Sequence, residues 1–203
     1  MPERPSRADL EAARDTTIPD VLPPPGGPLG VLFCGVNPSL YSGATGRHFA
    51  RPGNRFWPAL YGAGLVPRPL GPYEQDELPR YGLGITNLVA RATARADELT
   101  TGELRTGRER LAGLVGAYRP RVLAVAGVTA YRTAFGRPRA AIGPQDDLVG
   151  GAHVWVLPNP SGLNASWTLP RLVSAFAEVR ASKWVGTELN SARDRDVERG
   201  DHP

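Results

Sequence analysis

The sequence has little of what a metal centre or a disulfide framework requires. Cys34 is its only cysteine, which excludes an intramolecular disulfide, a four-cysteine zinc site and a four-cysteine iron–sulfur cluster. The three histidines are far apart and lack the spacing of metal ligands: His48, His153 and His202. We therefore expect neither a bound metal nor any other cofactor.

Long apolar runs are also missing. No stretch approaches the ~20 apolar residues that cross a membrane, and the N-terminus lacks the apolar core of a signal peptide. The segment GATG at residues 43–46 has neither the G-x-G-x-x-G nor the P-loop spacing, so it does not indicate a phosphate cradle. We expect a cytoplasmic protein without a membrane partner, associated with the nucleoid if it is bacterial.

The charge is moderately basic and is supplied almost entirely by arginine. The net charge is +4, and 23 of the 24 basic residues are arginine. Guanidinium groups bind phosphate bidentately, so this composition is typical of a phosphate-binding surface. An arginine-biased proteome with a solvated surface has the same composition. Charge alone therefore supports a nucleic-acid partner without establishing one.

The two ends of the chain differ in composition from its middle. Residues 1–27 mix charges with proline and glycine, and residues 186–203 alternate in charge sign with almost no apolar residues. We expect flexible tails over 1–27 and 186–203, and one monomeric domain over 28–185.

Between the tails, short apolar runs alternate with helical patterns. Strands are expected at 31–34, 84–89, 122–126 and 153–157, and helices after Asn54 and at 101–118, 128–135 and 169–184. This alternation predicts an α/β fold with a parallel sheet covered by helices on both faces.

Two of the predicted strands end in an Asn-Pro pair, at Asn37 and at Asn159. Ligands of open α/β sheets bind outside the carboxyl ends of the strands, so we expect both loops to open onto one site. The Asn37 side chain can bond to local backbone in a turn, or it can hold a water molecule. Because an amide cannot remove a proton, a site centred on it suits a reaction with a good leaving group.

Two apolar residues in these polar loops have alternative interpretations. Phe49 is either a core residue or a surface on which a flat ring stacks. Leu163 either folds back onto the core or acts as a wedge that enters a base stack. Beside it, Ser161 and Asn164 are suited to bond phosphates or base edges.

Four segments, in order, resemble the mismatch-specific uracil-DNA glycosylase family, which includes the thymine-DNA glycosylases: GVNPS, GRHFARPGNRFWPALYGAG, GITNLVARAT and VLPNPSGLN. The resemblance runs from about Leu29 to Val185. It implies a three-layer α/β/α sandwich around a short, mainly parallel sheet. It also implies an enzyme that acts on double-stranded DNA containing uracil or mismatched bases. Such an enzyme flips the base out and hydrolyses its N-glycosidic bond, leaving an abasic site.

The resemblance also assigns roles to individual residues. Asn37 would position the attacking water, and Phe49 would stack on the flipped base. The backbone around Val36 would bond the base edge, with Asn87 as a further contact. Leu163 would fill the space that the base vacates.

Further expectations concern the rims of the site. Gly162 and Asn164 flank the wedge, and we expect Asn159, Ser161 and Arg91 to contact DNA phosphates. Ser39 stands where many relatives have glycine, so its hydroxymethyl group is expected to narrow the base pocket against the thymine methyl group.

The absence of an acidic residue from GVNPS favours a monofunctional hydrolase over the uracil glycosylases that use a carboxylate in this loop. Two other functions remain open at this stage. One is a DNA-binding module that recognises lesions without cutting them, and the other is an α/β enzyme that binds free nucleotides.

Overall fold

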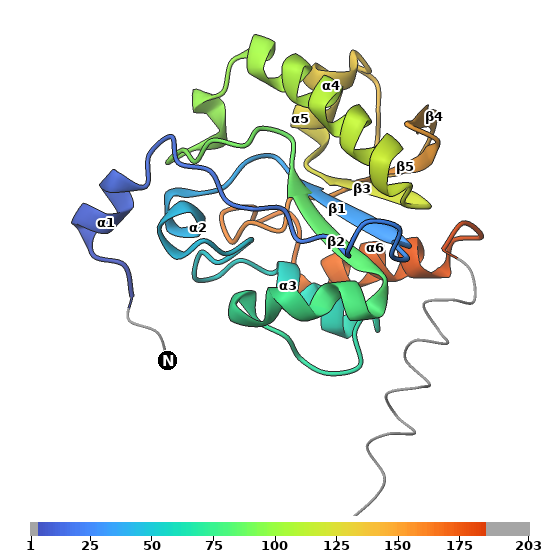
Figure 1. The fold of residues 1–203 in the computed structure, drawn as a ribbon, viewed down its shortest axis with the longest axis horizontal. Coiled ribbons are helices and arrows are strands. Elements are labelled where there is room, and N and C mark those ends of the chain that lie inside the picture. Colours follow the sequence, from blue (N-terminus) through green and yellow to red (C-terminus); the bar gives the residue numbers. More distant parts are fainter. Residues whose placement is uncertain (1–3, 186–203) are drawn as a thin grey trace, which may run out of the picture.

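A computed structural model describes residues 4–185 of the chain and gives an α/β fold (Figure 1). The strands are β1 (Val31–Gly35), β2 (Leu83–Asn87), β3 (Val122–Ala126), β4 (Gly143–Val149) and β5 (Ala152–Leu157). The α-helices are α1 (Arg7–Ala12), α2 (Leu40–Thr45), α3 (Phe56–Gly62), α4 (Thr101–Tyr118), α5 (Val128–Phe135) and α6 (Leu169–Ala181). Two 3₁₀ helices, η1 (Pro72–Tyr81) and η2 (Ala96–Glu98), complete the described part.

The strands form one sheet in the order β2-β1-β3-β5-β4. All neighbours are parallel except β4, which pairs antiparallel with β5 at the edge. The predicted mainly parallel α/β sheet is therefore confirmed. Strand β4 was not expected, because its sequence GPQDDLV is polar and only its two end residues are buried.

The sheet is covered on both faces, as predicted. Along β1, Val31 and Phe33 point into a core shared with α3 and α6, whereas Leu32 and Cys34 point into a core shared with α4 and α5. Figure 1 shows these helix pairs on opposite sides of the strands. All five residues of β1 are buried, as a central strand of a three-layer sandwich requires.

The segment before β1 falls in the range 1–27, for which the sequence predicts a flexible tail. Of this range, residues 4–27 pack along the domain. Val21 exchanges backbone hydrogen bonds with Ile85 of β2 at 2.8 and 2.9 Å, which covers the edge of the sheet. Ala13, Ile18 and Val21 are buried. Three apolar side chains at irregular spacing anchor the segment, and such spacing has no helix or strand period to predict from.

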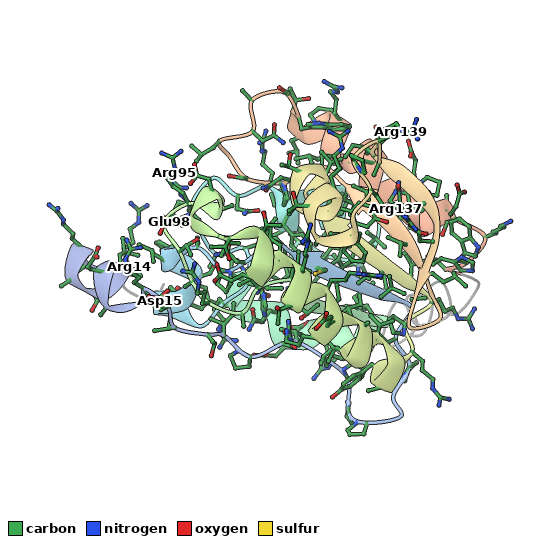
Figure 2. The ribbon with its side chains drawn as sticks, turned by 90° about the horizontal axis from the view of Figure 1, so that it is seen from above. Arg14, Asp15, Arg95, Glu98, Arg137 and Arg139 are labelled. Atoms are coloured by element: carbon green, nitrogen blue, oxygen red, sulfur yellow. The ribbon has the colours of Figure 1, made fainter. Side chains whose placement is uncertain are left out.

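Ion pairs connect the same N-terminal segment to the chain between β2 and α4. Arg14, just after α1, contacts Glu98 of η2 at 2.8 Å, and Figure 2 shows both at one end of the molecule. Asp15 contacts Arg91 at 2.9 Å. The predicted C-terminal tail, residues 186–203, lies outside the described residues. Within the described part, no helix is both long and apolar enough to span a bilayer.

Candidate active site

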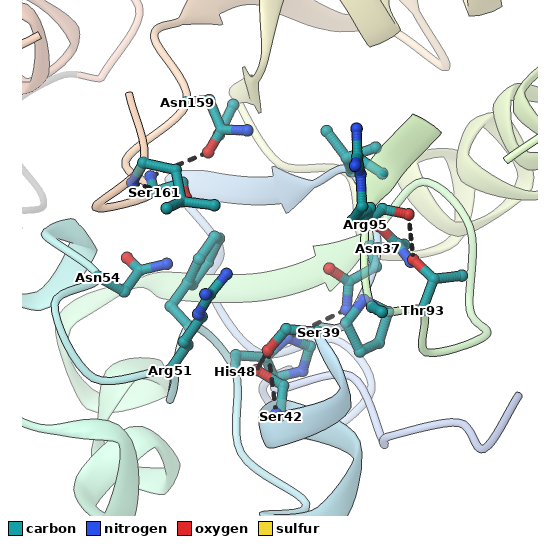
Figure 3. Close-up of a pocket in the computed structure, with 18 of the residues that line it drawn as sticks. Asn37, Ser39, Ser42, His48, Arg51, Asn54, Thr93, Arg95, Asn159 and Ser161 are labelled. Atoms are coloured by element: carbon teal, nitrogen blue, oxygen red, sulfur yellow. Dashed lines mark hydrogen bonds between the residues drawn. The ribbon is translucent and has the colours of Figure 1, made fainter. Parts of the chain in front are cut away.

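The loops after β1 and β5 meet in one pocket of about 620 Å³. The two strands are separated only by β3, and all three are parallel, so their carboxyl ends share one edge of the sheet. Asn37 and Leu163 both line the pocket. Figure 3 shows Asn37 beside Thr93 on one side of it and Ser161 with Asn159 on another.

The side chain of Asn37 is held in one orientation. Its Nδ2 donates to the Arg91 carbonyl at 3.0 Å and to Thr93 Oγ1 at 2.7 Å. The Thr93 hydroxyl donates its own hydrogen to the Arg95 carbonyl at 2.8 Å, so it can only accept from Asn37. Both amide hydrogens of Asn37 are thereby used, and Oδ1 remains as an acceptor in the pocket. The turn role in its own loop does not apply, because both partners lie in the loop after β2.

Phe49 forms one wall of the pocket. It is partly buried and has a φ of 52°, a left-handed conformation that is uncommon for a residue with a side chain. Its ring stacks on Phe56 with the centroids 4.1 Å apart and the planes 14° apart. Gly35 leaves the space that the ring needs, since a Cβ there would lie 3.3 Å from Phe49 Cζ and 2.6 Å from Asn87 Oδ1.

Asn87, at the end of β2, is oriented by a histidine that the sequence argument did not assign. His48 Nε2 lies 2.8 Å from the Pro19 carbonyl, which only accepts, so the ring carries its hydrogen on Nε2. Nδ1 is then an acceptor, and Asn87 Nδ2 lies 3.3 Å from it. This arrangement leaves Asn87 Oδ1 beside Gly35 and Phe49 as a second acceptor facing the pocket.

His48 itself is 1% exposed, and this burial lowers its pKa below the usual 6.5. The ring is therefore neutral at pH 7. Its partner Pro19, and Ile18, which lines the pocket, both come from the segment that was expected to be a tail.

Ser39 lines the pocket and also begins α2. Its Oγ accepts from the Ser42 amide at 3.1 Å, which is an N-cap hydrogen bond. Val36 lines the pocket beside Asn37, and its carbonyl accepts from the Val89 amide at 2.9 Å. These contacts tie the loop after β1 to the chain that follows β2.

Leu163 projects from the loop after β5. It is 75% exposed, the most exposed large apolar side chain within residues 4–185. The interpretation in which it folds back onto the core is therefore wrong. The adjacent Gly162 passes so close to the loop before α3 that a Cβ there would lie 2.7 Å from the Gly53 carbonyl.

Polar side chains of the loop after β5 (residues 158–168) mainly build the loop itself. Asn159 Oδ1 accepts from the Ser161 amide at 3.0 Å, Ser161 Oγ accepts from the Leu163 amide at 3.3 Å, and Asn164 Nδ2 donates to the Asn159 carbonyl at 3.0 Å. Asn159, Ser161 and Asn164 also line the pocket, so the structure brings these predicted residues together with Asn37.

Arg91, which is predicted to contact a DNA phosphate, has partners within the protein. Its guanidinium is occupied by Glu103 at 2.5 Å, by Asp15 at 2.9 Å and by the Glu98 carbonyl at 3.1 Å. The pairing with Arg91, together with hydrogen bonds from Thr100, lowers the pKa of Glu103 to about 2. Arg91 therefore fastens the loop after β2 to α4 and to the N-terminal segment.

Arg51 is a further cation at the pocket, and it was not predicted from the sequence. It is exposed and lines the pocket, and within residues 4–185 its guanidinium has no hydrogen-bond or ion-pair partner. Arg95 also lines the pocket, but it pairs with Asp97 at 2.5 Å. Asp97 is the one carboxylate among the described pocket residues. Its partner is already beside it, and it lies on η2 at the pocket rim.

Some of the missed residues carried a signal in the sequence. His48 and Arg51 are close to Phe49 in the sequence, and this proximity to a predicted site residue could have indicated them. Thr93 acts only by orienting Asn37 across two loops, and no spacing in the sequence reveals such a contact.

Taken together, the fold and the pocket define an α/β protein with a site at the carboxyl edge of its parallel strands. Its walls are an aromatic face, two amide oxygens and an exposed leucine, and at its mouth is Arg51, which has no partner among the described residues. A family model described as the uracil DNA glycosylase superfamily matches residues 24–180, and the chain belongs to this superfamily. Membership implies a DNA substrate and base excision of the DNA-glycosylase type.

Proposed function

We propose that the protein is a monofunctional DNA glycosylase that removes uracil from G·U mispairs in duplex DNA. We further propose that it belongs to the mismatch-specific branch that its four segments resemble. The observation that carries this proposal is that Asn37 Oδ1 faces the same pocket over which Leu163 projects.

Asn37 holds the attacking water. Both of its amide hydrogens are committed to Arg91 and Thr93, so Oδ1 accepts a hydrogen from water and aims a lone pair of the water oxygen at the sugar carbon. No proton transfer to Asn37 is needed, because the departing uracil ring delocalises the negative charge of the broken bond, and the proton that the water loses passes through solvent to this anion. Hydrogen-bond donors near the ring oxygens stabilise that charge, and the backbone around Val36 and Phe49 is the proposed source.

The base lies between Phe49 and the Asn87 amide. The Phe49 ring, backed by Phe56, offers a face worth ~1–3 kcal/mol of stacking. Asn87 Oδ1 accepts from the N3–H that uracil carries. Cytosine has an acceptor at this position and would oppose it. Ser39 narrows the pocket on the side of the base that bears a methyl group in thymine.

Leu163 enters the helix as the base leaves, and Gly162 and Asn164 shape the loop around it. Extruding a base costs a few kcal/mol, least at a mismatch, which favours mispaired uracil. Full burial of a leucine is worth ~1.5–3 kcal/mol and offsets part of that cost. Phosphates are bound by Arg51, with the Asn159 amide nitrogen and the Ser161 hydroxyl beside it.

The test is release of free uracil from a labelled G·U duplex under single-turnover conditions. Asn37→Ala should slow release about 10²–10³-fold while keeping the melting temperature and duplex binding. Thr93→Val, which removes one of the two contacts that orient Asn37, should give an intermediate loss. Tight binding to the G·U duplex with no release by wild type would identify a lesion-recognising module instead. Undiminished release by Asn37→Ala would reject the role of Asn37.

A further inference from the structure

Arg55 binds the loop after β5 more extensively than any pocket residue does. Its guanidinium donates to the carbonyls of Ser161, of Asn164 at 2.9 Å and of Trp167 at 2.6 Å. Its backbone amide donates to the Pro160 carbonyl at 2.9 Å. One residue outside the loop therefore holds four carbonyls spread over residues 160–167.

These contacts make Arg55 and the loop depend on each other. The residue is partly buried and precedes the N-terminus of α3, where a positive charge is not favoured. Within the described residues no carboxylate pairs with its guanidinium, and its Nε is buried without a partner. The carbonyls of Ser161, Asn164 and Trp167 therefore stabilise the cation, and they meet at one guanidinium because the loop folds around it.

The held carbonyls lie on both sides of Leu163. Ser161 is two residues before it and Asn164 directly after it, while Leu163 itself is 75% exposed. An apolar side chain on a free loop would fold back onto nearby apolar surface. Fixing the backbone on either side keeps the leucine extended before DNA arrives.

Arg55 also links the loop that bears Leu163 to the aromatic wall of the pocket. Phe56, next to Arg55, is the ring on which Phe49 stacks at 4.1 Å. The N-terminus of α3 thus carries the support of the wedge and the backing of the stacking ring on consecutive residues.

We propose that Arg55 is a positioning residue that pre-organises Leu163 as a rigid wedge. This inference rests on the proposed base-flipping function. A pre-organised loop loses no conformational entropy on insertion, so Arg55 should matter where a base must be extruded from a stack. It should matter little where the base is already unpaired.

The experiment compares uracil release from a G·U duplex and from single-stranded DNA for full-length wild type and three variants. Arg55→Lys retains the charge but cannot reach three carbonyls with one planar fork, and Arg55→Met removes the charge. Arg132→Met is the matched control, because Arg132 on α5 also donates to a backbone carbonyl, that of Ala140, and neither residue lines the pocket. We expect roughly tenfold slower release from duplex for Arg55→Lys, less than about twofold change on single strands, and no change for Arg132→Met.

A second arm combines Arg55→Lys with Leu163→Ala. If Arg55 acts through Leu163, the double variant should be within about twofold of Leu163→Ala alone. Equal losses on duplex and single strand, or fully additive losses, would overturn the proposal. Inactivity of wild type would instead reject the proposed function. Hydrogen exchange then still tests the loop, because Arg55→Lys should accelerate exchange of the amides in residues 161–167, and unchanged exchange would overturn it.

Discussion

His48 Nδ1 accepts a hydrogen bond from Asn87 Nδ2 at 3.3 Å, while Nε2 of the same ring donates to Pro19 at 2.8 Å. The N-terminal segment therefore fixes the tautomer of His48, and His48 fixes the amide of Asn87. A protonated ring would present a donor on both nitrogens and would confront the Asn87 NH₂ group. The proposed recognition of the base by Asn87 therefore requires a neutral His48.

The burial of neutral His48 should make the folded protein less stable as the pH decreases. Burial lowers the pKa of His48 below 6.5, so the unfolded chain takes up a proton near pH 6.5 and the folded chain does not. The stability contributed by neutral His48 is present above that pH and is lost progressively as the pH falls below it. We expect the melting temperature of wild type to drop from about pH 7.5 to about pH 5.5, and to drop less in His48→Gln. His153→Gln is the control, and an equal drop in wild type and His48→Gln would contradict the assignment.

Leu163→Ala should separate extrusion from chemistry. The leucine matters only where a base leaves a stack, so release of uracil from a G·U duplex should slow by about tenfold or more while release from single strands changes little. Leu148→Ala provides the control, since Leu148 on edge strand β4 is also exposed, at 58%. Equal losses on both substrates would mean that Leu163 supports the fold.

Arg51 and Arg91 should respond differently to truncation. Arg51→Ala removes a cation from the pocket mouth, so the slope of log K against log salt for duplex binding should become shallower by about 0.9. Arg91→Ala breaks its contacts with Glu103 and Asp15, so it should lower the melting temperature and leave the salt slope unchanged. The measurement is duplex affinity over a salt series together with thermal unfolding. A shallower slope for Arg91→Ala would instead support its predicted phosphate contact.

Ser39→Gly should widen the substrate range. Losing the hydroxymethyl group makes room for a methyl group on the base, so the rate of thymine release from G·T relative to uracil release from G·U should rise by roughly tenfold. The loss of the N-cap costs only a few tenths of a kcal/mol when glycine replaces serine. Ser42→Ala removes the hydroxyl to which Ser39 Oγ donates at 3.2 Å and keeps both the N-cap amide and the Ser39 hydroxymethyl group, so its ratio should match wild type. An unchanged ratio in Ser39→Gly would mean that the thymine methyl group does not lie against Ser39.

The parts of the fold that could be predicted are those with a strong period. The central strands are continuous apolar runs bounded by glycine and proline, and the long helix α4 begins with the Thr100–Glu103 capping box. Helix α2 and strand β4 were missed because each is short and carries no continuous apolar face. The packing of the N-terminal segment could not be predicted, because its composition is that of a tail and only its backbone pairing with β2 reveals a structural role.

The candidate site divides along the same line. Asn37, Phe49 and Leu163 stood out because each is a residue type that its local pattern does not explain. Arg55 and Thr93 did not, because they act on backbone carbonyls and on another side chain's orientation. Such contacts depend on which loops meet in space and leave no spacing in the sequence.

The close passage of Gly162 past the Gly53 carbonyl ties the leucine-bearing loop to the chain that leads into α3. Because backbone packs against backbone there, the two segments move only together. The proposed Leu163 wedge would then stay fixed, and the DNA duplex would have to bend around it. The rate of uracil release should then increase with the flexibility of the flanking base-pair steps, and it should be highest next to pyrimidine–purine steps such as TA. A rigid protein would in this way inherit a sequence preference from the mechanics of its substrate.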